Sequence, residues 1–126
     1  IVITKNTTDA INLVATAYLE YSLKNTPSKH GRWNVVISAA EHHANILPWQ
    51  RLCHEYQGEL RVAELDENGL LEAAAFETLI DEQTLLVSVT HVSNVLGLLP
   101  LRPYLRVSIV LSVSSRFLIS FLSLSL

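Results

Sequence analysis

The sequence predicts an α/β fold with a mainly parallel sheet, because short apolar runs alternate with segments of helical periodicity. Residues 35–37 and 85–89 are rich in Val, Ile and Leu, a composition typical of buried strands. Residues 60–65 alternate between apolar and polar side chains, as a half-buried strand does. Strands that alternate with helices at such short intervals form βαβ units, whose strands run parallel.

The first helix is expected to begin at Asn6-Thr7-Thr8-Asp9, where polar capping side chains precede an acidic residue. Pro27 disfavours helical geometry at the residue before it, so the helix should fade near Asn25. The short apolar run at residues 1–3 is interpreted as the end of a strand. One apolar stripe follows the helical repeat and gives the buried face of this helix: Ile11, Val14, Ala15, Tyr18 and Leu19.

The remaining elements follow in order along the chain. A polar loop is expected over residues 25–33, after the first helix. A second helix is expected over about residues 46–57, ending at Gly58, and a third over residues 72–80. Asp66-Glu67-Asn68-Gly69 has the composition of a turn.

Composition bounds the class of protein. The 126 residues suffice for one domain, and a net charge of −3 gives no reason to expect nucleic acid or an anionic membrane as a partner. Cys53 is the one cysteine, so an intrachain disulfide is excluded and a reducing compartment is favoured. We expect its thiol to be packed and structural. The chain begins at Ile1 without methionine, which suggests a cut N-terminus, and no signal-peptide pattern is present.

The character of the sequence changes after Gly97. Up to that residue there are six basic and twelve acidic residues, whereas residues 98–126 carry three Arg and no acid. Nine Leu and seven Ser dominate these 29 residues, an excess that a shifted reading frame tends to produce. A divergent natural end and a membrane segment are the alternatives, although Arg106 and Arg116 interrupt the apolar stretch. Residues 1–97 are therefore treated as one partial domain and 98–126 as an aberrant tail.

Three polar segments are expected where strands end or helices begin, which is where open parallel sheets bind ligands. Residues 6–12 could bind an anion through free backbone N–H groups and threonine hydroxyls. In residues 41–49, a histidine could stack on a planar ligand or exchange protons, but two adjacent histidines alone are a poor zinc pair. In residues 90–97, Asn94 could donate to a ligand oxygen. Taken singly, each pattern is more often a helix cap, a structural histidine or a turn asparagine.

Taken together, these segments resemble the class V aminotransferase-like, fold type I enzymes that use pyridoxal 5'-phosphate. The resemblance is to SufS-type cysteine desulfurases and selenocysteine lyases. It is carried by Thr7-Thr8-Asp9-Ala10-Ile11-Asn12-Leu13-Val14, by Glu41-His42-His43-Ala44-Asn45-Ile46-Leu47-Pro48-Trp49-Gln50 and by Thr90-His91-Val92-Ser93-Asn94-Val95-Leu96-Gly97. Their order and spacing also fit, over about residues 1–97. This implies the N-terminal part of an incomplete fold type I large domain.

The resemblance implies a role for each matched residue. By this resemblance, Thr8 with the backbone of Thr7 is expected to bind the phosphate of the cofactor. His42 is expected to stack on the pyridine ring, and Asn94 to contact the phenolic oxygen of the cofactor or the substrate. Asn6 stands where the family often has glycine, beside the expected approach of the phosphate.

Residues that the family needs for turnover have no match. Its Schiff-base lysine lies well after the third segment, whereas the lysines here, Lys5, Lys24 and Lys29, all precede His42. Cys53 does not correspond to the catalytic cysteine that carries the persulfide. We therefore identify no catalytic residue and no metal ligand, and we expect the chain alone to be inactive.

The implied parent enzyme removes sulfur from L-cysteine, giving alanine and an enzyme persulfide for iron–sulfur cluster assembly. Selenocysteine lyase, acting on L-selenocysteine, and kynureninase-like enzymes are alternatives within the family. A truncated, non-catalytic paralogue that serves as a binding or dimerisation module is a further alternative. The resemblance implies a homodimer, a possible sulfur-acceptor protein, no nucleic acid or membrane partner, and a cytoplasmic location, with an organelle as the alternative.

Overall fold

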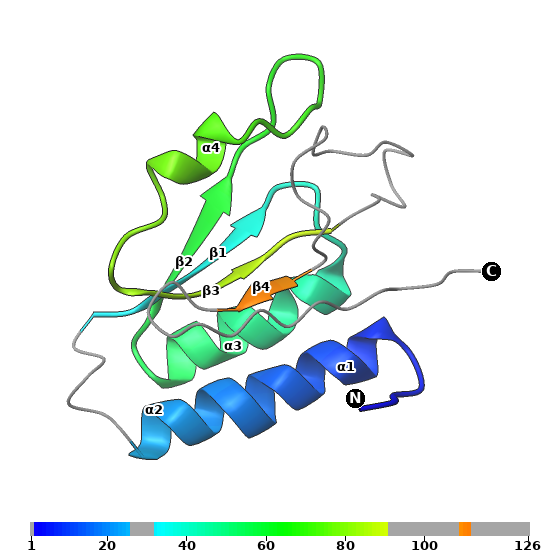
Figure 1. Cartoon of the computed structure of the whole chain (residues 1–126), viewed down its shortest axis with the longest axis vertical. Coiled ribbons are helices and arrows are strands. Elements are labelled where there is room, and N and C mark those ends of the chain that lie inside the picture. Colours follow the sequence, from blue (N-terminus) through cyan, green and yellow to red (C-terminus); the bar gives the residue numbers. More distant parts are fainter. Residues whose placement is uncertain (1, 26–31, 91–108, 112–126) are drawn as a thin grey trace.

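The computed structural model describes residues 2–25, 32–90 and 109–111 (Figure 1). In these residues a four-stranded sheet has the order β2-β1-β3-β4. The central strand β1 pairs parallel with both β2 and β3, whereas β4 runs antiparallel to β3. The prediction of an α/β fold with a mainly parallel sheet is therefore confirmed. The strands are β1 (Asn34–Ser38), β2 (Glu59–Ala63), β3 (Thr84–Ser88) and β4 (Ile109–Leu111).

Apolar side chains cover both faces of the sheet at β1 and β3, which explains why these two strands read as continuous apolar runs. Val35 and Ile37 of β1 pack on one face with the first helices and with α3 (Leu47–Glu55). Val36 points to the other face, where it packs with Phe76 of α4 (Ala74–Glu77). Every residue of β1 is buried, as expected for the central strand of a sheet covered on both sides.

One helical rod runs along the first face and is coloured blue in Figure 1. It consists of α1 (Thr7–Leu13), a π-helical stretch (Val14–Glu20) and α2 (Tyr21–Asn25). The predicted cap is confirmed, because Asn6 Oδ1 accepts a hydrogen bond from Asp9 N at 2.8 Å. The wider winding of the π stretch was not predicted. Because a π-helix has more residues per turn than an α-helix, side chains spaced by four residues stay on the buried side of the rod through this stretch. In a continuous α-helix they would drift around the axis. The buried residues with this spacing are Ile11, Ala15, Leu19 and Leu23.

Some predicted boundaries were wrong. Residues 1–3 do not end a strand where they are described, because Val2 and Ile3 are 67% and 93% exposed and pair with no strand. The helix expected over 72–80 is only the short α4. Leu79 N and Ile80 N both donate to Phe76 O, at 2.9 and 3.0 Å, which closes the helix and turns the chain toward β3.

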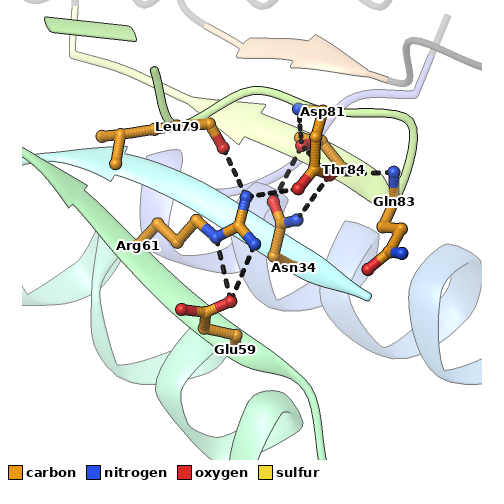
Figure 2. A network of polar contacts seen from close by, with 7 residues as sticks. All are labelled: Asn34, Glu59, Arg61, Leu79, Asp81, Gln83 and Thr84. Atoms are coloured by element: carbon orange, nitrogen blue, oxygen red, sulfur yellow. Dashed lines mark hydrogen bonds and ion pairs between the residues drawn. The ribbon is translucent and has the colours of Figure 1, made fainter. Parts of the chain in front are cut away.

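A polar cluster ties together the amino ends of the parallel strands (Figure 2). The guanidinium group of Arg61 binds the carboxylates of Glu59 and Asp81, at 2.9 and 2.7 Å. Asn34 Nδ2 donates to Asp81 Oδ1 at 3.0 Å, and Thr84 Oγ1 donates to Asn34 Oδ1 at 2.8 Å. The hydrogen bonds from Arg61 are the main reason that the pKa of Asp81 falls to about 2. The starts of β1, β2 and β3 are thus fixed at the edge opposite the candidate site.

No helix within the described ranges has both the length and the apolar character needed to cross a bilayer.

Candidate functional site

The carboxyl ends of β1 and β3 lie next to each other, because the two strands are parallel neighbours. Ile37 near the end of β1 is in register with Ser88 at the end of β3. The chain leaves β1 into the segment that contains His42, and it leaves β3 into Thr90. Two of the segments singled out in the sequence therefore leave the sheet at the same edge, where α/β proteins commonly bind ligands.

Glu41 holds these two exits together through a buried carboxylate. Its Oε1 accepts hydrogen bonds from Ser38 Oγ at 2.5 Å and from Thr90 N at 2.7 Å. Its Oε2 accepts a hydrogen bond from Asn45 Nδ2 at 2.7 Å. Burial raises the pKa of Glu41, while the hydrogen bonds from Asn45, Ser38 and Thr90 act in the opposite direction.

Asn45 extends this network into α3 and β3. Its Oδ1 accepts hydrogen bonds from Trp49 Nε1 at 2.9 Å and from Ser88 Oγ at 2.7 Å. An indole N–H can only donate, so it fixes the carbonyl side of the amide toward Trp49 and the NH₂ side toward Glu41. Trp49 and Ser88 are fully buried, which makes this contact part of the core as well as of the site.

His42 caps the 3-10 turn His43–Asn45 and is itself exposed. Its Nδ1 accepts a hydrogen bond from Ala44 N at 3.2 Å, so the neutral ring carries its proton on Nε2. The rings of His42 and His43 lie 6.1 Å apart at an interplanar angle of 73°. This is an edge-to-face contact, so the two imidazoles present different surfaces.

Thr8 and the histidine turn border the same hollow, which has a volume of about 280 Å³. His43 lines this hollow, whereas His42, its neighbour in the chain, is not among the lining residues. Thr7 is exposed in the first turn of α1, and Asn94 lies outside the described residues. Hydroxyl, amide, imidazole and guanidinium groups make this hollow suitable for hydrogen bonds to an anionic ligand: its lining is Thr8, Asn12, His43, Ala44, Leu47, Pro48 and Arg51.

Cys53 does not line this hollow; it lies in α3, and its side chain packs into the core. Burial is the main cause that raises the pKa of its thiol to about 12, so the thiolate is scarce at neutral pH. This agrees with the expectation of a packed, structural thiol. In the part of the chain that the structure describes, no group of three or more His, Cys, Asp or Glu side chains could hold a metal ion.

Sequence reasoning missed the network of Glu41 and Asn45, although its signals were present. Ser38 and Ser88 are single polar residues at the ends of apolar strands, where only hydrogen-bonded side chains are tolerated. Glu41, Asn45 and Trp49 are spaced by four, as side chains stacked along one helical side would be. Their convergence depends on the β1–β3 register, which the sequence does not display.

Comparison with known proteins gives a consistent picture over most of the chain. The chain is 45% identical over 97 residues to a cysteine desulfurase of Cronobacter sakazakii (strain ATCC BAA-894). The matched region covers 77% of this chain and 22% of that protein. It is 46% identical over 97 residues to a cysteine desulfurase of Escherichia coli (strain K12 / DH10B), with the same coverage. The chain thus spans about 22% of the length of these curated relatives.

Solved structures agree with the sequence matches. The crystal structure of the cysteine desulfurase CsdA (S-sulfonic acid) from Escherichia coli has a TM-score of 0.67 and 28% identity, covering 77% of this chain and 23% of that one. The apo cysteine desulfurase of Thermococcus onnurineus NA1 has a TM-score of 0.59 and 35% identity, covering 78% of this chain and 22% of that one. The sequence profile named "Aminotransferase class-V" matches residues 1–107. The chain belongs to the aminotransferase class-V family.

Proposed function

We propose that this chain supplies the front part of the pyridoxal-phosphate-binding domain of a cysteine desulfurase. The observation that carries the proposal is the hollow shared by Thr8 of α1 and the turn that follows β1. The chain brings a threonine hydroxyl and a histidine turn, separated by more than thirty residues in sequence, to one place at the sheet edge. Enzymes of this family depend on pyridoxal 5'-phosphate, and the relatives reported above, which match over 97 residues, are cysteine desulfurases.

The residues present fit such a ligand. Thr8 offers a hydroxyl donor at the amino end of the helical rod, and the backbone of Thr7 precedes it. His42 is exposed and held in orientation by its bond from Ala44 N, so one face of its ring is available for stacking on a pyridine. Asn94 is assigned to the phenolic oxygen or the substrate. When bound, the cofactor supplies an electron sink for the substrate, and these residues anchor and orient it.

For the parent enzyme we propose L-cysteine as substrate, with alanine and an enzyme-bound persulfide as products. L-selenocysteine is the alternative substrate. We further propose a homodimer in the cytoplasm that passes sulfur to an acceptor protein for iron–sulfur cluster assembly. The lysines of this chain, Lys5, Lys24 and Lys29, all precede His42. The isolated 126-residue chain should therefore release no sulfide from L-cysteine in the presence of pyridoxal 5'-phosphate.

Binding of pyridoxamine 5'-phosphate to the purified chain tests the site. This probe lacks an aldehyde and cannot attach covalently to lysine, so calorimetric titration reports only the non-covalent site. Thr8→Val should weaken both the probe and inorganic phosphate, whereas His42→Ala should weaken the probe alone. Thr16→Val and His54→Ala make the same changes at exposed positions and should have no effect.

A wild-type chain that binds neither ligand would refute the proposed site. Equal losses in the Thr8→Val and Thr16→Val variants would refute the role of Thr8. Equal losses of affinity for the probe in His42→Ala and His54→Ala would refute the role of His42.

A further inference from the structure

Glu41 is a buried acidic residue at the carboxyl edge of the sheet, and none of the proposed ligand contacts uses it. It is 8% exposed, and its carboxylate joins β1, the 3-10 turn and the exit of β3. We propose that Glu41 is a positioning residue, which fixes the orientation of His42 relative to Thr90 at the edge where the ligand binds. The ligand-facing half of this inference rests on the proposed function.

The geometry requires Glu41 to act as an acceptor at both oxygens. The Thr90 amide can only donate, and the indole of Trp49 fixes Asn45 so that its NH₂ group faces Glu41. A glutamine at this position would set its own NH₂ group against one of these two donors. The isosteric, neutral side chain should therefore break one arm of the network and remove from one of these donors the acceptor that Glu41 now provides.

The same network reaches His42 through the backbone of the turn. Asn45 N donates to His42 O at 2.8 Å, while Ala44 N donates to His42 Nδ1 at 3.2 Å. Asn45 thus contacts Glu41 with its side chain and His42 with its backbone. Thr90, on the other side of Glu41, begins the segment that carries Asn94 in the sequence. The Glu41 carboxylate therefore connects the turn that begins at His42 to the start of the sequence segment that contains Asn94.

Amide hydrogen exchange in the ligand-free, full chain tests the network directly. In the Glu41→Gln variant, the amide on the side of the broken arm, that of Thr90 or that of Ala44, should exchange about tenfold faster. The amide of Val36, in the middle of β1, should keep its rate. Glu64→Gln, the same change at an exposed residue just after β2, should alter none of these rates.

A second variant tests whether the effect comes from the Glu41 carboxylate itself or from any change in its surroundings. Ser38→Ala removes one donor to Glu41 but keeps the charge and the bond from Thr90 N. Exchange at Thr90 should therefore stay close to the wild-type rate. An acceleration that matches the Glu41→Gln variant would overturn the assignment to the Glu41–Thr90 bond.

Ligand binding tests the orientation of His42. Glu41→Gln should weaken pyridoxamine 5'-phosphate about tenfold, as one misplaced contact to the ring would, and should leave the affinity for inorganic phosphate unchanged. In a His42→Ala background the same change should have no further effect on the probe, because the contact that it orients is already gone. A purely structural role would weaken both ligands together and would persist without His42.

The remaining outcomes decide between two claims: that Glu41 fixes the exits of β1 and β3, and that it thereby orients His42 toward the ligand. Unchanged exchange at Thr90 and Ala44, or equal acceleration at Val36, overturns the positioning role. Unchanged affinity of Glu41→Gln for the probe overturns its ligand-facing half. A wild-type chain that binds no probe defeats the proposed function and that half with it, whereas the exchange rates still decide whether Glu41 fixes the two exits.

Discussion

Asn45→Ala removes the centre of the buried network and should destabilise the fold strongly. The substitution leaves the Trp49 indole N–H, the Ser88 hydroxyl and Glu41 Oε2 without the partner that each has now. An unsatisfied buried group costs about 1–3 kcal/mol. The Ser88 hydroxyl can rotate, so about two such penalties remain and the expected loss is about 2–6 kcal/mol. This is a large fraction of the roughly 5–15 kcal/mol that stabilises a typical domain.

Urea denaturation of a graded series measures this loss. Ser88→Ala removes one donor only and should cost about 1 kcal/mol. In the Asn45→Ala background, Ser88→Ala should cost almost nothing, because its hydroxyl has already lost its acceptor. The reasoning is refuted if Asn45→Ala costs no more than Ser88→Ala, or if the two losses simply add.

Three further predictions address other parts of the chain. Cys53 has a pKa of about 12, so iodoacetamide should alkylate it at pH 8 roughly a thousandfold more slowly in the native than in the unfolded chain; similar rates would contradict its burial. The pKa of Asp81 falls from its ordinary 3.8 to about 2, so its stabilising effect is present above pH 3.8 and is lost as the pH falls toward 2. The urea midpoints of wild type and Asp81→Asn should therefore converge over that range, and a constant gap would exclude this ionisation as the cause. A Cβ at Gly58 would lie 2.4 Å from the Trp33 ring, so Gly58→Ala should lower the free energy of unfolding by about 1–3 kcal/mol in urea denaturation. If the clash is the cause, Gly58→Ala should cost less in a Trp33→Leu background than in the wild type.

Local patterns were enough to predict the main elements of the fold. The β-branched run at Val35-Val36-Ile37 predicted a buried strand, and β1 is indeed covered on both faces. Asn6 predicted a helix start because capping depends on only a few neighbouring residues. The predicted length of the helix over residues 72–80 was wrong because the apolar pattern there is also satisfied by one short turn of helix followed by a hydrogen-bonded turn.

Prediction of the site was limited by its dependence on tertiary contacts. The strings around Thr8 and His42 identified segments that the fold does bring to one edge of the molecule. That His43, rather than His42, lines the hollow with Thr8 depends on the packing of α1 against the 3-10 turn. The bond from Thr90 to Glu41 spans 49 residues, and no short-range pattern contains it.

The position of β1 in the sheet has a consequence for how the chain is made. Both of its partners, β2 and β3, follow it in sequence, so β1 leaves the ribosome before either of its edges can pair. Parallel pairing needs distant segments and is slow to form. During synthesis the nascent strand therefore exposes two unpaired backbone edges together with its apolar side chains, and chaperone binding at residues 34–38 would protect it from association with other chains.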